Sequence, residues 1–529
     1  MKNKTLSTLI LSLAIVLMAS NAFSQALFQN TYSSSISLKP MYSGPASGSG
    51  IIICGITDAT PSNGFICKTN LNGVVQWTKK IGGSQEDVIN VVRPTSDGGY
   101  IAVGYTKSSG AGDRDVLLIK LDASGNLTWS KTYGTTTVDV GYDVIQTSDG
   151  GFAAVGYARA VLAATNKGGF LVFKTNGSGA LSWYKIYGED GAIAAKSILQ
   201  KSNGSLIVSG RAWGSTFITV QEINIGDGSI NWAKGHTLMG PVAKVINTQI
   251  ISGDSLIVFS SGSDNGKQSF SLLLLNPDGT KQWAYNYRNY SSISDDIFGG
   301  MTKTWNGYLV SGNSYGNSGS FKNPNMIWID RAGNVKSSRL YHGINNASGD
   351  IGFDIVKLDD GTHITTGAYG SSILLIKSNW IGNMGCSNSI INTQRNSQAT
   401  ISGPLSLTNW GHNGAITVNT ASLTATSLSL TKTTLCSTSV GIKTSAPLSG
   451  QDIKVFPNPF KYKFEINLAK EYNDVEITIY DVLSHIIYTN NYQSTNKITI
   501  SRNNMASGVY FYQIKSQSDI ISSGKVIAH

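Results

Sequence analysis

Short apolar runs separated by Gly, Asn and Asp dominate the chain from residue 26 to about residue 380. The segment TSDGGYIAVGY at 95–105 returns as TSDGGFAAVGY at 147–157. Around it a longer unit recurs: an Asp, a strand, a Gly turn, a second strand, a variable loop, an apolar strand, another Gly turn and a strand that carries Trp. A unit of four short strands in about 50 residues is typical of one blade of a β-propeller. The pattern therefore predicts an all-β repeat fold.

The units can be counted from the aromatic residue of their fourth strand. It is Trp77, Trp129, Trp183, Trp232 and Trp283 in the first five units, while Ser337 holds this place in the sixth. The seventh unit, at 350–380, stops before its fourth strand. The sequence ALFQNTYS at 26–33 matches that missing strand, with Phe28 in the Trp position and Tyr32 in the position of Tyr133. We therefore expect a seven-bladed β-propeller over 25–385, four strands per blade, in which the N-terminal strand closes the last blade and leaves no open junction.

The repeat also resembles a known class of sequence. The unit with TSDGGY, VGYT and DVLLIKLDASGNL is similar to the β-propeller repeats of bacterial secreted and surface proteins, over roughly residues 26–385. This resemblance implies the same fold as the periodicity.

The first 24 residues read as a secretion signal. Lys2 and Lys4 precede an apolar run over 9–18, and Ala22-Phe23-Ser24 places small residues where a signal peptidase cuts, so we expect cleavage before Gln25. No other stretch of about 20 apolar residues occurs, so an integral membrane protein is not expected. The sequence predicts export through the periplasm.

Residues 386–450 change character, because Ser, Thr and Asn dominate and acidic residues vanish. We interpret them as a Ser/Thr-rich linker, or as a weakly structured β segment that a Cys386–Cys436 disulfide would staple.

The other two cysteines lie in neighbouring predicted strands. Cys54 and Cys67 could pair, since exported chains support disulfides. The alternative is that both are small buried hydrophobic residues, because they occupy the positions of Val103 and Ile119 in the next unit.

Alternating apolar residues between turns over 451–529 predict a small antiparallel β-sandwich. This region closely resembles the C-terminal sorting domain of the type IX secretion system of Bacteroidetes. The family's marked positions are held by Phe456-Pro457-Asn458-Pro459, Gly508-Val509-Tyr510 and Lys525, and Ser484 stands where the family usually has glycine. The resemblance implies engagement of the type IX machinery and delivery to the cell surface or the medium.

The formal charge of +10 does not indicate a nucleic-acid partner. It is spread along the chain, and no Lys/Arg run interleaved with aromatic residues appears.

Variable loops that gather on one face of a propeller are the candidate ligand site. Aromatic residues there could stack on sugar rings or on peptide side chains, or else pack on neighbouring loops. The candidates are Trp213, Tyr290, Tyr315, Phe321, His236 and His342.

Recurring acids precede the first strand of several units: Asp87, Asp139, Asp296 and Asp350. They could bind Ca²⁺ around the central channel, or each could accept backbone N–H bonds at its own turn. We interpret Asp113 and Asp115, which occur in one unit only, as part of a solvated loop.

Catalytic patterns are weak. His236, His342 and His363 belong to three different units, and the loop candidates for acid/base work are Glu189, Asp190, Asp295 and Asp350. We therefore assign no catalytic residue and no cofactor. The leading hypothesis is a binding or adhesion module for an extracellular glycan or protein. The alternatives are a secreted glycan-active enzyme, such as a polysaccharide lyase or glycosidase, and a structural spacer.

Overall fold

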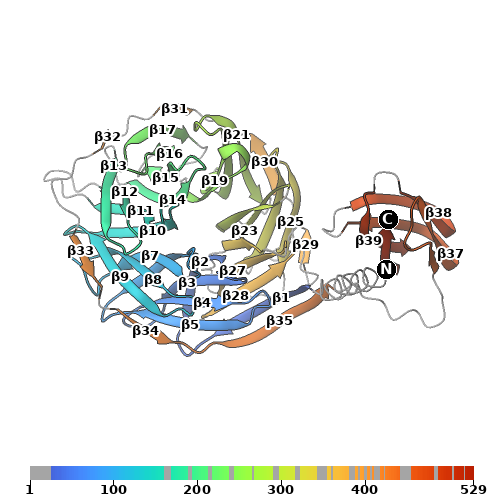
Figure 1. Cartoon of the computed structure of the whole chain (residues 1–529), viewed down its shortest axis with the longest axis horizontal. Helices are drawn as coiled ribbons and strands as arrows, with labels where there is room; N and C mark the ends of the chain where they lie inside the picture. The colour runs from blue at the N-terminus through green and yellow to red at the C-terminus, as the bar shows by residue number, and fades with distance from the viewer. Residues whose placement is uncertain are drawn as a thin grey trace, which may run out of the picture. The chain divides into compact units, whose positions relative to one another are not determined.

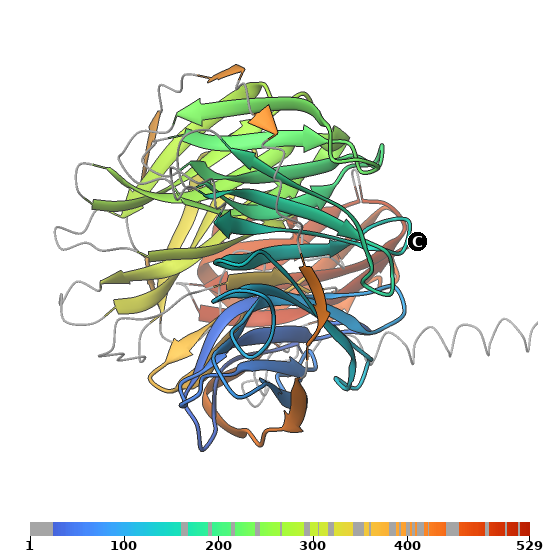
Figure 2. The ribbon, with the colours of Figure 1, turned by 90° about the vertical axis from the view of Figure 1, so that its left-hand side faces the viewer.

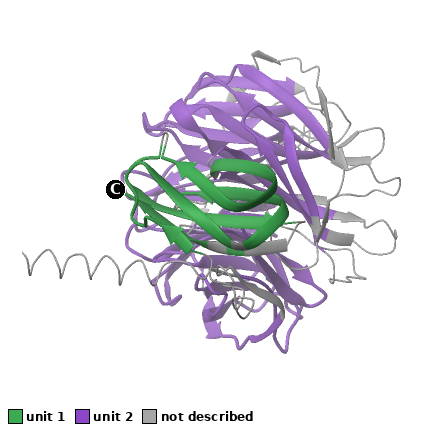
Figure 3. Cartoon of the chain, turned by 90° about the vertical axis from the view of Figure 1, so that its right-hand side faces the viewer, with its two compact units in different colours: residues 1–26, 439–529 green, residues 27–438 purple. Residues whose placement is uncertain are grey.

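The computed structural model forms two compact units, residues 27–438 and residues 439–529 together with 1–26 (Figure 3). It describes residues 25–529 except 160–167, 189–192, 213–216, 238–243, 265–266, 290–296, 305, 316–321, 342–353, 359–360, 380–387, 391–392, 398–401, 405–407, 410–416, 422, 441–453, 482–485, 503–504 and 517–518. The expected signal peptide at 1–24 lies outside this range. Apart from a 3₁₀ turn at Ser252–Asp254, the described regular structure is all strand. Among the described residues, no helix has the length and apolar character required to cross a membrane.

The described part of the first unit contains seven five-stranded antiparallel sheets around a ring, the arrangement of a β-propeller (Figure 1). The first strands, at the centre, are β2 (Leu38–Pro45), β6 (Asp87–Pro94), β10 (Asp139–Gln146), β14 (Ile193–Gln200), β18 (Lys244–Ile250), β22 (Ile297–Thr304) and β26 (Asp354–Lys357). The second strands are β3 (Ile51–Thr57), β7 (Tyr100–Thr106), β11 (Phe152–Arg159), β15 (Leu206–Ala212), β19 (Leu256–Asp264), β23 (Gly307–Tyr315) and β27 (His363–Tyr369). The third strands are β4 (Gly64–Thr69), β8 (Asp115–Leu121), β12 (Gly168–Thr175), β16 (Phe217–Ile223), β20 (Lys267–Leu275), β24 (Lys322–Asp330) and β28 (Ser372–Ser378). The fourth strands are β5 (Val75–Gly82), β9 (Leu127–Gly134), β13 (Leu181–Gly188), β17 (Ile230–Thr237), β21 (Lys281–Asn289), β25 (Val335–Tyr341) and, in the last sheet, β1 (Gln25–Ser33).

Closure of the ring by the N-terminal strand is confirmed. Strand β1 pairs antiparallel with β28, from Phe28 opposite Lys377 to Tyr32 opposite Ile373. The Tyr32 hydroxyl donates to the carbonyl oxygen of Gly73 in the first sheet at 2.6 Å. The Tyr133 hydroxyl makes the same bond to Gly179, also at 2.6 Å, between two sheets inside the ring. The closing seam therefore repeats an ordinary contact between neighbouring blades.

Of the two interpretations of 386–450, the structure agrees with the β segment and corrects the linker. This segment supplies the fifth strand of every described sheet at the rim of the ring (Figure 2). These strands are β29 (Asn388–Ile390), β30 (Thr393–Ser397), β31 (Ser402–Pro404), β32 (Thr408–Asn409), β33 (Thr417–Thr420), β34 (Thr424–Ser427) and β35 (Thr431–Val440), here called the belt. They join the sheets of β22, β18, β14, β10, β6, β2 and β26, so the belt runs round the ring against chain order.

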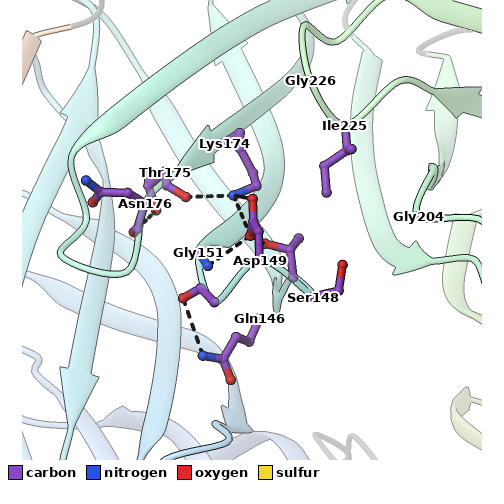
Figure 4. Close-up of polar contacts among 12 residues, drawn as sticks. Gln146, Ser148, Asp149, Gly151, Lys174, Thr175, Asn176, Gly204, Ile225 and Gly226 are labelled. Atoms are coloured by element: carbon purple, nitrogen blue, oxygen red, sulfur yellow. Dashed lines mark hydrogen bonds and ion pairs between the residues drawn. The ribbon is translucent and has the colours of Figure 1, made fainter.

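The two Asp-Gly-Gly turns between first and second strands hold buried lysines, Lys120 at Asp97 and Lys174 at Asp149, and Figure 4 shows the second. Lys174 Nζ lies 2.9 Å from Asp149 Oδ2 and 2.9 Å from the Thr175 carbonyl oxygen. Gly150 has a φ of +80°, which favours glycine. A Cβ at Gly151 would lie 2.2 Å from the Thr175 carbonyl oxygen and 2.4 Å from Lys174 Nζ. The second glycine of the motif is therefore required for the lysine to reach its partners.

Cys54 and Cys67 are buried free thiols, which agrees with the alternative that both are small buried hydrophobic residues and corrects the disulfide between them. In the β3–β4 register, Cys54 is opposite Ile66 and Cys67 is opposite Ile53. Cysteines offset by one residue point to opposite faces of a sheet, and the two side chains indeed lie in different apolar clusters. Burial raises the pKa of both thiols. The expected Cys386–Cys436 pair lies outside the described side chains.

The C-terminal unit is one antiparallel sheet. Its strands are β36 (Lys454–Phe456), β37 (Lys463–Tyr480), β38 (Ile486–Ser501), β39 (Gly508–Ser516) and β40 (Asp519–Ala528). The long strand β37 pairs with β36 through its first half and with β39 through its second. Side chains from both halves share a single core, so the predicted sandwich takes the form of one folded sheet.

Candidate functional site

Most of the loop residues predicted to bind a ligand fall outside the described part of the chain: Trp213, Tyr290, Phe321 and His342, together with the side chain of Tyr315, which ends β23. His236 is described, and it is not a loop residue. Strand β17 extends to Thr237, and the His236 ring is fully buried in it. Burial and the nearby Lys234 ammonium lower the pKa of His236 to about 4, so the ring is neutral at pH 7. The prediction for His236 was wrong because strand β17 continues through His236 to Thr237.

Two of the four recurring acids are described, and both begin a first strand. The Gly83 N–H donates to Asp87 Oδ2 at 2.7 Å, and the Thr135 N–H donates to Asp139 Oδ2 at 2.6 Å. These contacts support the local turn role that the sequence leaves open for them. Asp296 and Asp350 lie outside the described residues. Within the part that the structure describes, no three His, Cys, Asp or Glu side chains gather as a metal site.

Three half-exposed tyrosines lie at the end of the ring that carries the loops between second and third strands. Tyr105 and Tyr157 occupy equivalent places near the ends of β7 and β11. Tyr142 lies on the first strand β10, at a bulge between Gly141 and Asp143. A bulge inserts an extra residue that is left unpaired, so its side chain does not follow the regular alternation between the two faces of the sheet. We call Tyr105, Tyr142 and Tyr157 the tyrosine cluster.

Cationic groups lie against this cluster. Arg114 Cζ lies 4.8 Å from the centroid of the Tyr105 ring, and Lys196 Nζ lies 2.9 Å from the centroid of the Tyr142 ring. Lys196 occupies the bulge of the next first strand, β14. Cations over aromatic faces are attracted by the ring quadrupole. The inner ends of three neighbouring sheets thus present alternating aromatic and basic groups.

Glu86 completes the charge pattern. The Tyr105 hydroxyl donates to its carboxylate, and Lys107 Nζ and Arg114 Nη2 lie 3.4 and 3.7 Å from it. The hydrogen bond from Tyr105 lowers the pKa of Glu86, so the carboxylate is ionised at neutral pH. Burial and this carboxylate raise the pKa of Tyr105, so the hydroxyl stays protonated as a donor. The cluster can therefore offer ring faces, a hydroxyl and charges of both signs to a polar ligand.

A second polar group joins the first strands deeper in the ring. Arg93 Nη2 donates to Asp143 Oδ1 at 2.9 Å and to Oδ2 at 3.0 Å, and the Ile198 N–H of the next sheet donates to Asp143 Oδ2 at 3.0 Å. Asp354, at the equivalent place in the last sheet, accepts the Ser43 N–H of the first sheet at 3.0 Å. Burial raises the pKa of Asp354 to about 6. These acids connect neighbouring blades, including the first and the last.

Neither group was found from the sequence. The tyrosine cluster lies on strands, whereas the search was limited to loops; the repeated VGY of 103–105 and 155–157 is the signal that could have shown two members. Asp143 and Asp354 share the pattern Gly-aromatic-Asp, in GYD and GFD. That recurrence could have indicated their common role.

In the C-terminal unit, the marked residues of the resemblance come together around the last strand. Asn458 Nδ2 donates to the Lys525 carbonyl oxygen at 2.9 Å, and the Ile527 N–H donates to Asn458 Oδ1 at 2.9 Å. Pro457 and Pro459 flank Asn458, each after a cis peptide bond. Gly508 and Tyr510 pair with Ala528 and Val526 on the same strand β40. The Pro-Asn-Pro segment therefore holds the C-terminal strand to the sheet.

In the comparison with known protein families, the match lies in the C-terminal unit. Residues 454–529 match the family described as secretion system C-terminal sorting domain. No curated protein matches the sequence.

Solved structures similar to the chain include Sqt1 from Chaetomium thermophilum, with 10% identity over 66% of this chain and 98% of that one, at a TM-score of 0.40. Drosophila Plexin A in complex with Semaphorin 1b has 7% identity over 67% and 87%, at 0.40. The Dos1 propeller has 10% identity over 94% and 95%, at 0.32.

The family match and the geometry of the Pro-Asn-Pro segment concern the same residues, and they agree with the resemblance drawn from the sequence. The chain is a β-propeller protein that carries, at residues 454–529, a C-terminal sorting domain of the type IX secretion system, of the kind found in Bacteroidetes.

Proposed function

We propose that this chain acts outside the cell as a binding or adhesion module, with an extracellular glycan or protein as its ligand. We further propose that it crosses the periplasm behind a cleaved signal at 1–24, and that the seven described sheets are the complete set of propeller blades. The sorting domain provides the export step, so the ligand function belongs to the propeller.

The tyrosine cluster is the observation that carries this proposal. Tyr105, Tyr142 and Tyr157 are half-exposed at the loop-bearing end, and two of their rings lie against Arg114 and Lys196. Aromatic side chains give large contact area at low entropic cost, and their hydroxyls can bond to a polar ligand. An array of rings and charges of this kind suits a sugar chain or a polar peptide.

The test uses the whole mature chain, residues 25–529, because a fragment ending at 385 would lack the belt. It is screened on a glycan array and against extracellular matrix proteins, together with a Tyr142→Ala variant. Tyr462→Ala, which removes a 74% exposed tyrosine from the C-terminal unit, is the matched control. We expect selective binding that Tyr142→Ala weakens at least tenfold and Tyr462→Ala leaves unchanged.

Other outcomes contradict the proposal. Turnover of a bound glycan would indicate an enzyme instead. Absence of any selective ligand would indicate a spacer, and binding that Tyr142→Ala leaves intact would place the site elsewhere.

A further inference from the structure

Two buried carboxylates lie at the junction between the second and third sheets. Asp115 begins β8 and is 1% exposed, and Asp139 begins β10 and is 0% exposed. Asp115 is thus not in the solvated loop that the sequence indicates. Arg114 and Val138, the residues before them, form a parallel bridge, and the Asp139 N–H donates to the Arg114 carbonyl oxygen at 2.7 Å. The two acids therefore start from adjoining backbone positions.

The preceding junction provides an internal reference. Asn63, Gly82, Asp87 and Thr106 stand 52 residues before Asp115, Gly134, Asp139 and Ala158. A Cβ at Gly82 would lie 1.7 Å from Asn63 Oδ1 and 2.9 Å from Asp87 Oδ2, so both side chains point at one place. A Cβ at Gly134 would likewise lie 1.8 Å from Asp115 Oδ1. Gly82 thus leaves room for two convergent polar side chains, and Gly134 leaves the same room for Asp115.

The reference junction is satisfied within the protein. Thr106 Oγ1 donates to Asp87 Oδ1, and Ser108 Oγ donates to Asp87 Oδ2 at 2.8 Å. Its partner Asn63 is a neutral amide, whose Nδ2 donates to the Pro61 carbonyl oxygen at 3.1 Å. One buried negative charge with several donors is an arrangement that needs nothing further.

The second junction differs in charge and in donors. Asp115 replaces the neutral amide, and Ala158 replaces the hydroxyl of Thr106. Asp115 Oδ1 and Asp139 Oδ1 are both buried with no hydrogen-bond partner. Burial raises the pKa of Asp139 to about 6, and the charge of Asp115 adds to the rise. Burial also raises the pKa of Asp115.

The basic side chain nearest in sequence does not compensate this charge. The guanidinium of Arg114 lies over the Tyr105 ring and pairs with Glu86. Unpaired buried carboxylates are costly, and they persist when they bind a cation or a proton.

Further oxygen atoms lie near Asp139 and near Gly112, which bonds to Asp115. Thr135 Oγ1 lies 2.9 Å from Asp139 Oδ2. The carbonyl oxygens of Thr137 and Thr135 lie 2.1 and 3.0 Å from the Cβ position of Gly112, whose N–H donates to Asp115 Oδ2 at 3.0 Å. Carboxylate, hydroxyl and carbonyl oxygens are the ligands that Ca²⁺ prefers, whereas Mg²⁺ keeps several waters and fits buried sites poorly.

We propose that Asp115 and Asp139 form a Ca²⁺ site between the second and third blades, completed by oxygen atoms of the 135–137 turn. The site joins the loop before β8 to the turn before β10. It lies beside Tyr105 and Arg114, so the ion also orders the base of the tyrosine cluster. Extracellular Ca²⁺ modules bind with Kd of about 10⁻⁴–10⁻³ M, a range suited to an exported protein.

The test is calorimetric titration of the mature chain, stripped with chelator, with CaCl₂ and separately with MgCl₂. We expect one Ca²⁺ in this affinity range that Asp115→Asn removes, because this variant restores the amide of the reference junction. Asp113→Asn, which removes a largely exposed acid from the same loop, is the matched control and should bind as the wild type does. Ala158→Thr restores the missing donor, and it should weaken Ca²⁺ binding several-fold without removing an acid.

The outcomes that overturn the proposal are equally definite. Wild-type chain that binds no Ca²⁺ would refute the site. Ca²⁺ binding that Asp115→Asn and Ala158→Thr leave unchanged would place the ion elsewhere. If Asp115→Asn does not fold, the response of Ala158→Thr alone decides.

Discussion

The seam between the last and first blades can be tested by adding one methyl group to Gly73. Gly73 has a φ of +68°, and a Cβ there would lie 2.6 Å from the Tyr32 hydroxyl oxygen and 2.8 Å from Phe28 Cζ. Gly150 has a similar φ of +80°, but a Cβ there would have no atom within 4 Å. Gly73→Ala and Gly150→Ala therefore share the backbone strain and differ in the contact with β1.

The magnitudes follow from this difference. A left-handed conformation costs an L-residue roughly 1–2 kcal/mol, offset by about 0.4–1 kcal/mol through the less flexible unfolded chain. Gly150→Ala should thus lose about 0–1.6 kcal/mol. Gly73→Ala adds overpacking against buried rings, which costs about 1–3 kcal/mol more. Gly125→Ala, which would meet Trp77 at 2.7 Å between two blades inside the ring, should match Gly73→Ala.

The assay is urea and thermal unfolding of the mature chain, followed by tryptophan fluorescence. For a domain of about 400 residues, 1 kcal/mol corresponds to roughly 1 °C in Tm, so the urea midpoint and Tm are both measured. The expected order of stability is Gly150→Ala above Gly73→Ala, with Gly125→Ala equal to Gly73→Ala. Equal midpoints for Gly73→Ala and Gly150→Ala would refute the packing of β1 on the first blade.

Three further outcomes are expected. In the fourth blade the lysine lies on the turn and the acid on the third strand, with Lys201 Nζ 2.8 Å from Glu222 Oε2 and both side chains buried. Lys201→Met should lower the free energy of unfolding, measured in urea, by about 3–5 kcal/mol. The double variant Lys201→Glu with Glu222→Lys should recover most of the lost stability. A loss under 1 kcal/mol would contradict this. The pKa of Asp354, raised to about 6, means that the folded state holds the Asp354 proton more tightly than the unfolded chain does. Protonated Asp354 therefore stabilises the fold by about 3 kcal/mol below about pH 4, and this stabilisation is lost as the pH rises through 6. Asp354→Asn should therefore flatten the decline of the urea midpoint between pH 4 and 7, and an unchanged pH profile would argue against the assignment. Asn458→Ala removes two hydrogen bonds of 2.9 Å to the last strand, so hydrogen exchange in residues 519–528 should quicken by about tenfold or more, corresponding to about 1–3 kcal/mol; unchanged protection there would exclude the clamp.

The blades were predictable from the sequence because each unit repeats the same local chemistry. The Asp-Gly-Gly turn, the strand lysine and the fourth-strand aromatic recur together, and the turn and the lysine depend on each other in space, since only glycine at 151 leaves room for Lys174. Phe28 and Tyr32 could be placed in the last blade because they keep the spacing of that unit. Such repetition exposes both the strands and the closure.

The belt and the site were not predictable in the same way. The belt strands β29 to β34 have two to five residues each, too few for an alternating pattern, and pairing with distant fourth strands defines them. Tyr142 of the tyrosine cluster and Lys196 beside it lie at bulges in β10 and β14, which shift the register at points that no spacing marks. The separation of Cys54 from Cys67 depends on a one-residue offset in pairing, which sequence proximity does not reveal.

The belt also explains how a short N-terminal strand can hold a large ring closed. Strand β1 is not at an edge, because it lies between β28 and the belt strand β35. Lys432 of the belt extends over the same seam, with Nζ 5.7 Å from the centroid of the Phe28 ring and 3.5 Å from the Asn72 carbonyl oxygen. Elsewhere on the belt, Ala421 and Leu423 are buried in the apolar cluster between the first and second blades. Unpaired strand edges recruit other chains, and each described blade of this propeller has its fourth strand covered by the belt. The belt therefore protects the sheet edges and secures the N-terminal strand. Its polar composition, which suggests a linker in the sequence, is also compatible with strands that have one face toward solvent.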